Sequence, residues 1–214
     1  MNGVFEYYKN LFNAHGYRLY MVGGTSRDYL LNREINDYDF VSDATPLEIL
    51  KFLKANDTFK KYGVLKTKYS GINVDIVTLR EELEYKDHRH PLSIKFINDI
   101  NIDYKRRDFT INAIYIDENY KIIDPSSFGI IDLQNRHLRF IGDPLTRIKE
   151  DPLRILRAYR FIKEYSLSID DDVLKLLKEN EKLLLEINPN KINEEKKKME
   201  AIKDEIWKFK CIRY

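Results

Sequence analysis

The chain has 214 residues, of which 43% are hydrophobic and 34% are charged. This composition excludes collagen-like, disulfide-framework and disordered classes, and the length allows one large domain or two small ones. The net charge is only +2, from 37 Lys and Arg against 35 Asp and Glu residues, so any nucleic-acid site must be a local patch. A single cysteine, no apolar run near ~18–20 residues and no signal-peptide pattern predict a cytoplasmic protein with no membrane partner.

The first 140 residues combine helical and alternating patterns. Residues 4–14 have helical spacing, and residues 17–22 are typical of a short strand that ends at Gly23-Gly24. Next we expect a helix capped by Thr25 and extending to Leu31, a strand over 37–41, a helix from Thr45 through Lys54, and strands over 62–69 and 72–79. The sequence then predicts a mobile charged loop over 81–93, a buried helix over 109–115, and short strands over 120–123 and 138–140.

After Gly142-Asp143-Pro144 the pattern becomes purely helical. Three helices are predicted, two of them amphipathic over 147–165 and 170–186, and a more charged one over 193–210. The expected fold class is therefore α+β, in which a mixed sheet with flanking helices over residues 1–140 precedes an all-helical unit over residues 141–214.

The first candidate site is the sequence Gly23-Gly24-x-x-Arg27-Asp28, between a predicted strand and a predicted helix. Two glycines let a ligand approach the backbone closely, and free amides at a helix start attract phosphate. Arg27 can add a charge-assisted contact to the same phosphate. The alternative is an ordinary tight turn that carries a surface arginine.

The second candidate site is Asp37-Tyr38-Asp39. Residues two apart on a strand face the same side, so the two carboxylates converge. Close like charges repel unless a cation lies between them, and hard oxygen ligands suit a divalent ion. Asp75, a polar residue in an otherwise apolar strand, is the best candidate for a third carboxylate. Two metal ions bridged by such carboxylates suit in-line phosphoryl transfer, whereas the alternative is a solvated loop.

Two further motifs are rich in arginine. Arg106-Arg107-Asp108 precedes an apolar stretch that contains Asn112, and because the helix macrodipole disfavours basic residues at a helix start, this placement indicates an anionic partner. Residues 150–160 place arginines at three-residue spacing along one side of a helix. Asp151 and Arg154 are neighbours there, and they form either a surface salt bridge or an acceptor and donors for the edge of a base.

Two other charged segments have simpler interpretations. His88-Arg89-His90 has no cysteine or third ligand nearby in the sequence, so polar loop chemistry is favoured over a metal site. Lys196-Lys197-Lys198 follows two glutamates and is typical of a solvated helix face.

The order of the four motifs is more specific than any one of them. Val22-Gly23-Gly24-x-x-Arg27-Asp28, Asp37-Tyr38-Asp39, residues 106–113 and Glu150-Asp151-Pro152-Leu153-Arg154 together resemble the class II tRNA nucleotidyltransferase/poly(A) polymerase family. The similarity extends from about residue 17 to about residue 161 and includes Asp87-His88-Arg89-His90-Pro91. The resemblance implies a DNA-polymerase-β-like head domain over residues 1–140 and a helical neck with a short extension over residues 141–214.

The resemblance also implies roles for single residues. Asp37 and Asp39 would hold Mg²⁺, Asp75 is a less secure catalytic candidate, and Asp151 with Arg154 would read the incoming base. The residues implied in nucleotide binding are Gly23, Gly24, Arg27, Arg106, Arg107, Asn112, Asp151, Arg154, Arg157 and Arg160.

The expected function is template-independent, Mg²⁺-dependent addition of CMP and/or AMP, from CTP and ATP, to the 3′ end of RNA, with tRNA as the expected substrate. Poly(A) addition is the alternative within the same class. Family members continue into helical domains that grip tRNA, whereas residues 187–214 show no such signal. A protein partner or a homo-oligomer could therefore supply RNA contacts, and a non-catalytic nucleotide- or RNA-binding remnant is the alternative of another class.

Overall fold

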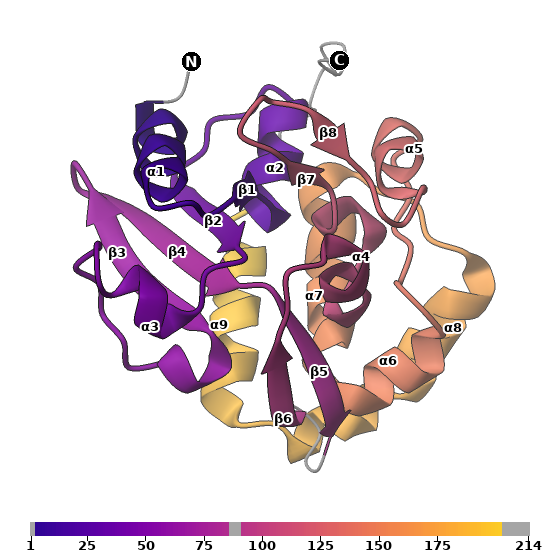
Figure 1. Ribbon diagram of the computed structural model, residues 1–214. Coiled ribbons are helices and arrows are strands. Elements are labelled where there is room, and N and C mark those ends of the chain that lie inside the picture. The colour runs from indigo at the N-terminus through magenta and orange to yellow at the C-terminus, as the bar shows by residue number, and fades with distance from the viewer. Residues whose placement is uncertain (1–2, 86–90, 203–214) are drawn as a thin grey trace.

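A six-stranded mixed sheet lies at the centre of the protein (Figure 1). The computed structural model describes residues 3–85 and 91–202. Along the sheet the strand order is β3-β4-β2-β1-β7-β8, in which β2 and β4 are parallel and the other neighbours are antiparallel. These strands are β1 (Leu19–Met21), β2 (Asp37–Ser42), β3 (Val64–Tyr69), β4 (Ile72–Thr78), β7 (Tyr115–Ile116) and β8 (Ile122–Ile123). The α+β fold class is confirmed.

Short helices and turns surround this sheet. Helix α1 (Gly3–Ala14) buries Val4, Phe5, Tyr8 and Phe12, an apolar stripe at helical spacing. The other elements of this part are α2 (Gly23–Leu30), α3 (Pro46–Ile49), α4 (Ile100–Asp103), α5 (Gly129–Gln134) and the 3₁₀ turns η1 (Lys60–Tyr62), η2 (Tyr104–Arg106) and η3 (Thr110–Asn112). The helix predicted from Thr45 through Lys54 ends early, at Ile49.

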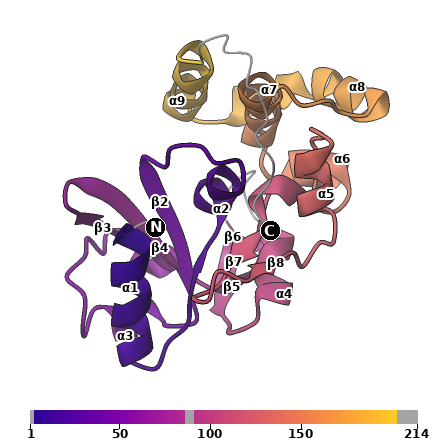
Figure 2. The same cartoon turned by 90° about the horizontal axis from the view of Figure 1, so that it is seen from above.

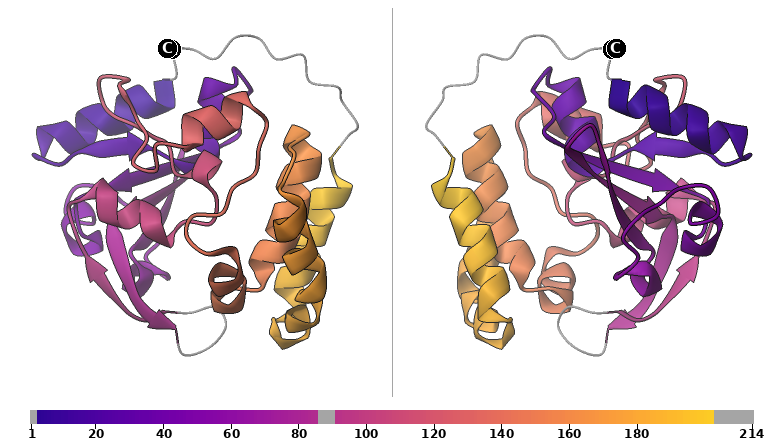
Figure 3. Two further views of the ribbon diagram at one scale, coloured as in Figure 1. Left: turned by 90° about the vertical axis from the view of Figure 1, so that its right-hand side faces the viewer. Right: turned by 90° about the vertical axis from the view of Figure 1, so that its left-hand side faces the viewer.

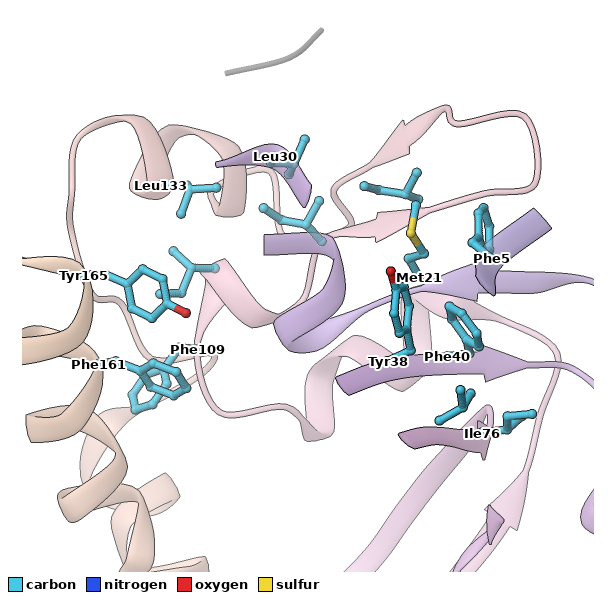
Figure 4. Close-up of a cluster of buried hydrophobic side chains, with 14 of the residues drawn as sticks. Phe5, Met21, Leu30, Tyr38, Phe40, Ile76, Phe109, Leu133, Phe161 and Tyr165 are labelled. Carbon is cyan, nitrogen blue, oxygen red and sulfur yellow. The ribbon is translucent and has the colours of Figure 1, made fainter. Parts of the chain in front are cut away.

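The C-terminal helices form a separate layer beside the sheet (Figures 2 and 3). They are α6 (Pro144–Glu150), α7 (Leu153–Tyr165), α8 (Asp171–Glu179), the 3₁₀ segment η4 (Glu181–Glu186) and α9 (Pro189–Glu200). Helices α7 and α9 lie side by side. Figure 4 shows Phe161 and Tyr165 of α7 beside Phe109, and the ring centroids of Phe109 and Phe161 are 5.7 Å apart. One cluster of buried apolar residues therefore includes both the sheet unit and α7.

The loop predicted over 81–93 is wrong in its described part. Strands β5 (Arg80–Tyr85) and β6 (Pro91–Phe96) form an antiparallel hairpin, with Arg80 opposite Phe96 and Glu82 opposite Ile94. The cross-strand partners supply order that the charged composition does not reveal. His88-Arg89-His90 lies outside the described residues.

The buried helix predicted over 109–115 is also wrong. Phe109 is extended and bridges Phe140, residues 110–112 form η3, and Tyr115 enters strand β7. Every residue from 108 to 116 is buried, and a continuous apolar run does not distinguish a helix from a strand. The strand predicted over 138–140 is reduced to that one bridge, whereas β8 lies within the predicted 120–123 strand.

The helix predicted over 147–165 is interrupted. Helix α6 ends at Glu150, Asp151 is extended, and α7 starts after Pro152, because a proline disfavours helical geometry in the residue before it. The helix predicted over 170–186 likewise divides into α8 and η4. Helix α9 starts four residues before the predicted 193, and residues 203–210 lie outside the described part. Within the described residues, no helix is both long enough and apolar enough to cross a bilayer.

Candidate functional site

Three carboxylates project from adjacent strands of the sheet. Asp37 and Asp39 alternate with buried Tyr38 along β2, and Asp75 of β4 lies directly opposite Asp39 in the parallel pair. Neighbouring side chains line an open cleft of about 640 Å³, which we call the carboxylate cleft: Asp37, Tyr38, Asp39, Asn56, Lys66, Thr67, Lys68, Asn73 and Asp75. The convergence predicted from the Asp-Tyr-Asp spacing is confirmed as geometry.

The three carboxylates have different surroundings. Asp37 accepts a hydrogen bond from Asn73 Nδ2 at 2.9 Å, and Asp75 pairs with Lys66 Nζ at 2.6 Å. Asp39 is open to solvent at the cleft but closely surrounded by protein. This desolvation and the charge of Asp75 raise the pKa of Asp39, against the lowering effect of Arg107. Asp39 is therefore the carboxylate for which a nearby cation would be most favourable.

The donor set fits a hard divalent cation in kind, because carboxylate oxygens are the ligands that Mg²⁺ prefers. Asp37 and Asp39 are the residues that would hold the ion. Within the described part of the chain, no three His, Cys, Asp or Glu side chains are gathered closely enough to form a metal cluster. Asp75, expected as a third carboxylate, stands opposite Asp39 but is engaged by Lys66.

The glycine turn is attached directly to the strand that carries these carboxylates. Val22 N donates to Asp39 O at 3.2 Å, and Asp39 N donates to Thr25 Oγ1 at 2.7 Å. The predicted helix start at Thr25 is therefore wrong, since α2 begins at Gly23 and the Thr25 hydroxyl serves β2 instead. Gly23 has φ +65°, and a Cβ atom there would lie 3.4 Å from Asp39 Oδ2. A residue without a side chain is needed at this position.

A second cleft, of about 480 Å³, lies between the sheet and α7. We call it the basic cleft, and it is lined by seven arginines and three aspartates, namely Arg27, Arg80, Arg106, Arg107, Arg154, Arg157, Arg160, Asp39, Asp108 and Asp151, together with Val22, Gly23, Gly24, Phe40, Val64, Val77, Asn112 and Phe161. All ten predicted nucleotide-binding residues line this cleft. Asp39 lines both clefts, so the acidic and basic parts of the site meet at its carboxylate.

Buried Asp103 orients the arginine pair of the third motif. Its carboxylate accepts from Arg106 Nε at 2.8 Å, Arg107 Nη2 at 3.0 Å and the Tyr115 hydroxyl at 2.7 Å. Burial alone would raise the pKa of Asp103, but the charges of Arg106 and Arg107 hold it well below its usual range. Sequence reasoning missed Asp103, and its only signal is an acidic residue three and four positions before the two arginines.

Arg27 is less accessible than predicted. It is only 5% exposed, and its guanidinium donates to Asn112 Oδ1 at 2.6 Å and to the Tyr165 hydroxyl at 2.5 Å. Its Nε pairs with Asp28 at 3.2 Å, and its guanidinium carbon lies 4.3 Å from the centre of the Tyr165 ring. Tyr165 had no sequence signal, because the contact joins two elements that are 138 positions apart.

The arginines of α7 are held in place by carboxylates. Arg154 donates to Glu150 Oε2 at 3.0 Å and to Arg147 O at 2.7 Å, and Asp151 caps the start of α7 by accepting from Leu153 N at 3.1 Å. Arg157 binds Asp108 through Nε at 2.8 Å and through Nη2. Arg160 binds Glu195 and Glu164. These bonds fix the side chains before any ligand is present.

The pKa of Asp108 shows the strength of its pairing with Arg157. Burial would raise its pKa, but the charge of Arg157 and the amide of Asn112 lower the pKa to about 2. Arg80, which also lines the basic cleft, was missed by sequence reasoning because it follows β4 with no motif around it.

A mixed sheet whose central strand carries two carboxylates, next to arginine-lined helices, defines a nucleotidyltransferase head of the DNA-polymerase-β type followed by a helical region. The comparison with known families agrees, since residues 19–139 match the family described as the poly A polymerase head domain. The chain belongs to this family, the class II tRNA nucleotidyltransferase/poly(A) polymerase family.

Several relatives are named CCA-adding enzymes. That of Geobacillus sp. (strain WCH70) is 39% identical over 186 residues, which are 86% of this chain and 46% of the relative. That of Staphylococcus haemolyticus (strain JCSC1435) is 42% identical over 165 residues, which are 77% of this chain and 41% of the relative. The chain thus spans about half the length of the curated relatives that it matches.

Solved structures show the same likeness. The Bacillus stearothermophilus CCA-adding enzyme in complex with CTP superposes with a TM-score of 0.82 at 32% identity, over 93% of this chain and 49% of that chain. The Thermotoga maritima CCA-adding enzyme complexed with tRNA superposes with a TM-score of 0.73 at 26% identity, over 94% of this chain and 47% of that chain.

Proposed function

We propose that this chain transfers CMP and/or AMP from CTP and ATP to the 3′ end of an RNA, and that the RNA is tRNA. The observation that carries the proposal is the meeting of the two clefts at Asp39, because one cleft offers carboxylates and the other offers seven arginines. The names of the relatives and the CTP and tRNA complexes of similar structures support the same assignment.

The reaction joins an RNA 3′-hydroxyl oxygen to the α-phosphorus of the nucleotide, and the bond to pyrophosphate breaks. Asp37 and Asp39 would hold Mg²⁺, which when bound lowers the pKa of the hydroxyl and neutralises charge on the leaving pyrophosphate. Arg107 and the backbone of Gly23-Gly24 bind and orient the triphosphate. The contribution of the chain is positioning and fixed electrostatics, as in other phosphoryl transfers.

Base choice is assigned to Asp151 and Arg154. A carboxylate acceptor and guanidinium donors read the edge of a base by hydrogen bonding. Glu150 and Arg147 O fix the Arg154 guanidinium, and Arg157 and Arg160 support it from the next two turns of α7. Selection by protein side chains is what makes a nucleic-acid template unnecessary.

Three further assignments belong to this proposal. The division into a head over residues 1–140 and a helical neck with its extension over residues 141–214 is supported by the end of the family match at residue 139. A cytoplasmic location follows from the proposed tRNA substrate. A protein partner or a second copy of the chain that supplies further RNA contacts is also part of this proposal. Poly(A) addition is the second candidate activity, favoured by the name of the matching family.

The test is incorporation of labelled CTP and ATP, with Mg²⁺, into tRNA transcripts that end before CCA, after C and after CC. The double variant Asp37→Ala/Asp39→Ala is the blank. Incorporation above the blank establishes the transferase, and the pattern of ends distinguishes CCA, CC, A and poly(A) addition. Nucleotide binding without incorporation would instead indicate a binding remnant or a subunit that needs a partner. Wild-type incorporation by the variant would remove the metal assignment.

A further inference from the structure

The carboxylate cleft continues from Asp39 to the edge of the sheet, which strand β3 forms (Figure 1). The register of β2, β4 and β3 sets two rows of side chains across these strands, namely Asp39-Asp75-Lys66 and Asp37-Asn73-Lys68. The alternate residues Leu65, Val74 and Ile76 are buried, so both rows lie on the face of the cleft. Each row therefore begins with a carboxylate on β2 and ends with a lysine on β3.

The two lysines have different surroundings. Lys66 Nζ pairs with Asp75 Oδ2 at 2.6 Å, so it offsets one carboxylate of the cleft. Lys68 is exposed, and within the described part of the chain it has no ion pair. Its ammonium group is therefore available to an anionic ligand.

The stability of the sheet does not explain this arrangement. An exposed ion pair such as that of Lys66 with Asp75 contributes little to stability, and Lys68 has no such pair. Nor is β3 open to a further strand at Lys66, since Lys66 N donates to Asn56 O at 3.1 Å and Lys66 O accepts from Asn56 N at 2.8 Å. Two lysines at the far end of a cleft that holds three carboxylates indicate a ligand with several negative charges.

The geometry of transfer assigns the two clefts to different substrates. In an in-line displacement the attacking oxygen and the leaving oxygen lie on opposite sides of the phosphorus. The arginines of the basic cleft are assigned to the triphosphate, so the RNA strand with the attacking 3′-hydroxyl enters along the carboxylate cleft, on the other side of Asp39. The carboxylates of this cleft would repel the phosphates of that strand, and the lysines reduce this repulsion.

We propose that Lys68 binds the phosphodiester backbone of the RNA near its 3′ end, and that Lys66 neutralises Asp75 so that the strand can approach. The proposal rests on the nucleotidyltransferase function proposed above. Strands β2 and β3 are two strand spacings apart, about 9.6 Å, so the phosphate that Lys68 contacts precedes the terminal nucleoside. Neither lysine lies in one of the four motifs of the sequence.

The test measures binding of a labelled tRNA transcript that ends after CC, over a series of salt concentrations. Lys68→Ala is expected to weaken binding severalfold and to lower the slope of log Kd against log salt concentration by about 0.7, the value of one phosphate contact on a single strand. Lys68→Arg should restore both. Lys121→Ala, an exposed change beside β8 at the other edge of the sheet, is the matched control and should bind this RNA as wild type does. The Kd for CTP and the Tm should stay at their wild-type values in Lys68→Ala.

Lys66 is tested by a double-mutant cycle with Asp75. Lys66→Ala leaves the Asp75 carboxylate uncompensated, so RNA binding should weaken, and the further change Asp75→Asn should restore it. The same change should not restore the salt slope that is lost in Lys68→Ala, because that slope reports a direct phosphate contact.

A second transcript, cut back to the last base pair of the acceptor stem, separates the strand end from the rest of the RNA. Lys68→Ala and wild type should bind this transcript alike. An equal loss with both transcripts overturns the proposal, and so does an unchanged affinity of Lys68→Ala for the transcript that ends after CC. A wild-type chain that binds neither transcript contradicts the proposed function itself, whereas wild-type binding with unaffected lysine variants contradicts only the role of the lysines.

Discussion

The Tyr165 hydroxyl at the end of α7 accepts a hydrogen bond from Arg27 Nη2 and donates one to Asp28 Oδ1 at 2.9 Å. One phenol thereby joins the helical layer to the helix that follows the glycine turn. Tyr165→Phe keeps the ring beneath the Arg27 guanidinium but removes the hydroxyl, so we expect stability to fall by about 1 kcal/mol. Binding of CTP should weaken severalfold while binding of CMP changes little, because Arg27 is assigned to the triphosphate.

Tyr159→Phe is the control for this variant. Tyr159 also lies on α7, and its hydroxyl bonds Glu181 at 2.9 Å, away from both clefts. Equal losses of CTP and CMP binding in Tyr165→Phe would contradict the link to Arg27.

The glycine turn predicts different outcomes for two similar substitutions. Gly23 and Gly71 both have positive φ, +65° and +86°, so alanine at either should cost about 1–2 kcal/mol of stability. Only at Gly23 would the added Cβ approach Asp39 Oδ2, at 3.4 Å, whereas nothing lies within 4 Å at Gly71. Gly23→Ala should therefore lower the incorporation rate by on the order of tenfold or more, and Gly71→Ala should not. Equal rates in the two variants would show that the turn is only structural.

The proposed role of Asp151 and Arg154 in base selection predicts a change in the preference among nucleotides, and not only in the rate of incorporation. Asp151→Ala removes the acceptor next to Arg154, so the preference for CTP and ATP over UTP and GTP should fall by about tenfold, the value of one good base contact. Binding of tripolyphosphate should be retained. Lys149→Ala, an exposed change in the last turn of α6, is the control. An unchanged preference in Asp151→Ala would move base reading to other residues.

The lowered pKa of Asp108 predicts that the fold loses stability in acid. Its pKa is lowered from 3.8 in the unfolded chain to about 2 in the folded protein, so its pairing stabilises the fold above pH 3.8. That contribution, about 2 kcal/mol, is lost as the pH falls from about 4 toward 2. Asp108→Asn should be less stable than wild type at pH 7, because Arg157 is then left uncompensated.

Urea unfolding of both proteins between pH 7 and pH 3 measures this difference. The free energy of unfolding of Asp108→Asn should fall less steeply with acid than that of wild type. If the free energies of unfolding of the two proteins fell in parallel as the pH is lowered, the Asp108–Arg157 ion pair would not be the cause of the loss of stability in acid.

Predictability from the sequence differed between the acidic and basic parts of the site. The Asp37 and Asp39 pair and its neighbour Asp75 were predictable because alternation along a strand fixes which side chains share a face. The ten nucleotide-binding candidates were predictable as a set from their motifs, although their roles await the experiments above. The side chains that hold these candidates in place are those of Asp103, Tyr165 and Glu195. They were not predictable, because their contacts depend on tertiary packing that the spacing of residues in the sequence does not encode.

The errors in the predicted elements have local causes. Residues 109–115 are buried on all sides, so their apolar residues show no period that would distinguish a helix from a strand. Between Glu150 and Leu153 one proline interrupts the helix, although the helical spacing of apolar residues continues beyond it. The hairpin of β5 and β6 was hidden by its charged residues, because Arg80 and Glu82 pair with each other at 2.7 Å and are largely buried, which their charge does not suggest. The domain division predicted at residue 140 stays a prediction, since one apolar cluster includes residues on both sides of it.

The backbone of Asp39 is tied to Val22 on one side and to Thr25 on the other. The glycine turn and the carboxylates therefore move as one piece, whereas the arginines of α7 belong to the other layer. A rotation between the layers would break the bonds from Tyr165 to Arg27 and from Arg157 to Asp108 and would divide one apolar cluster. We therefore expect substitutions in α7 that leave these two bonds intact to change nucleotide preference without displacing the carboxylates from the glycine turn.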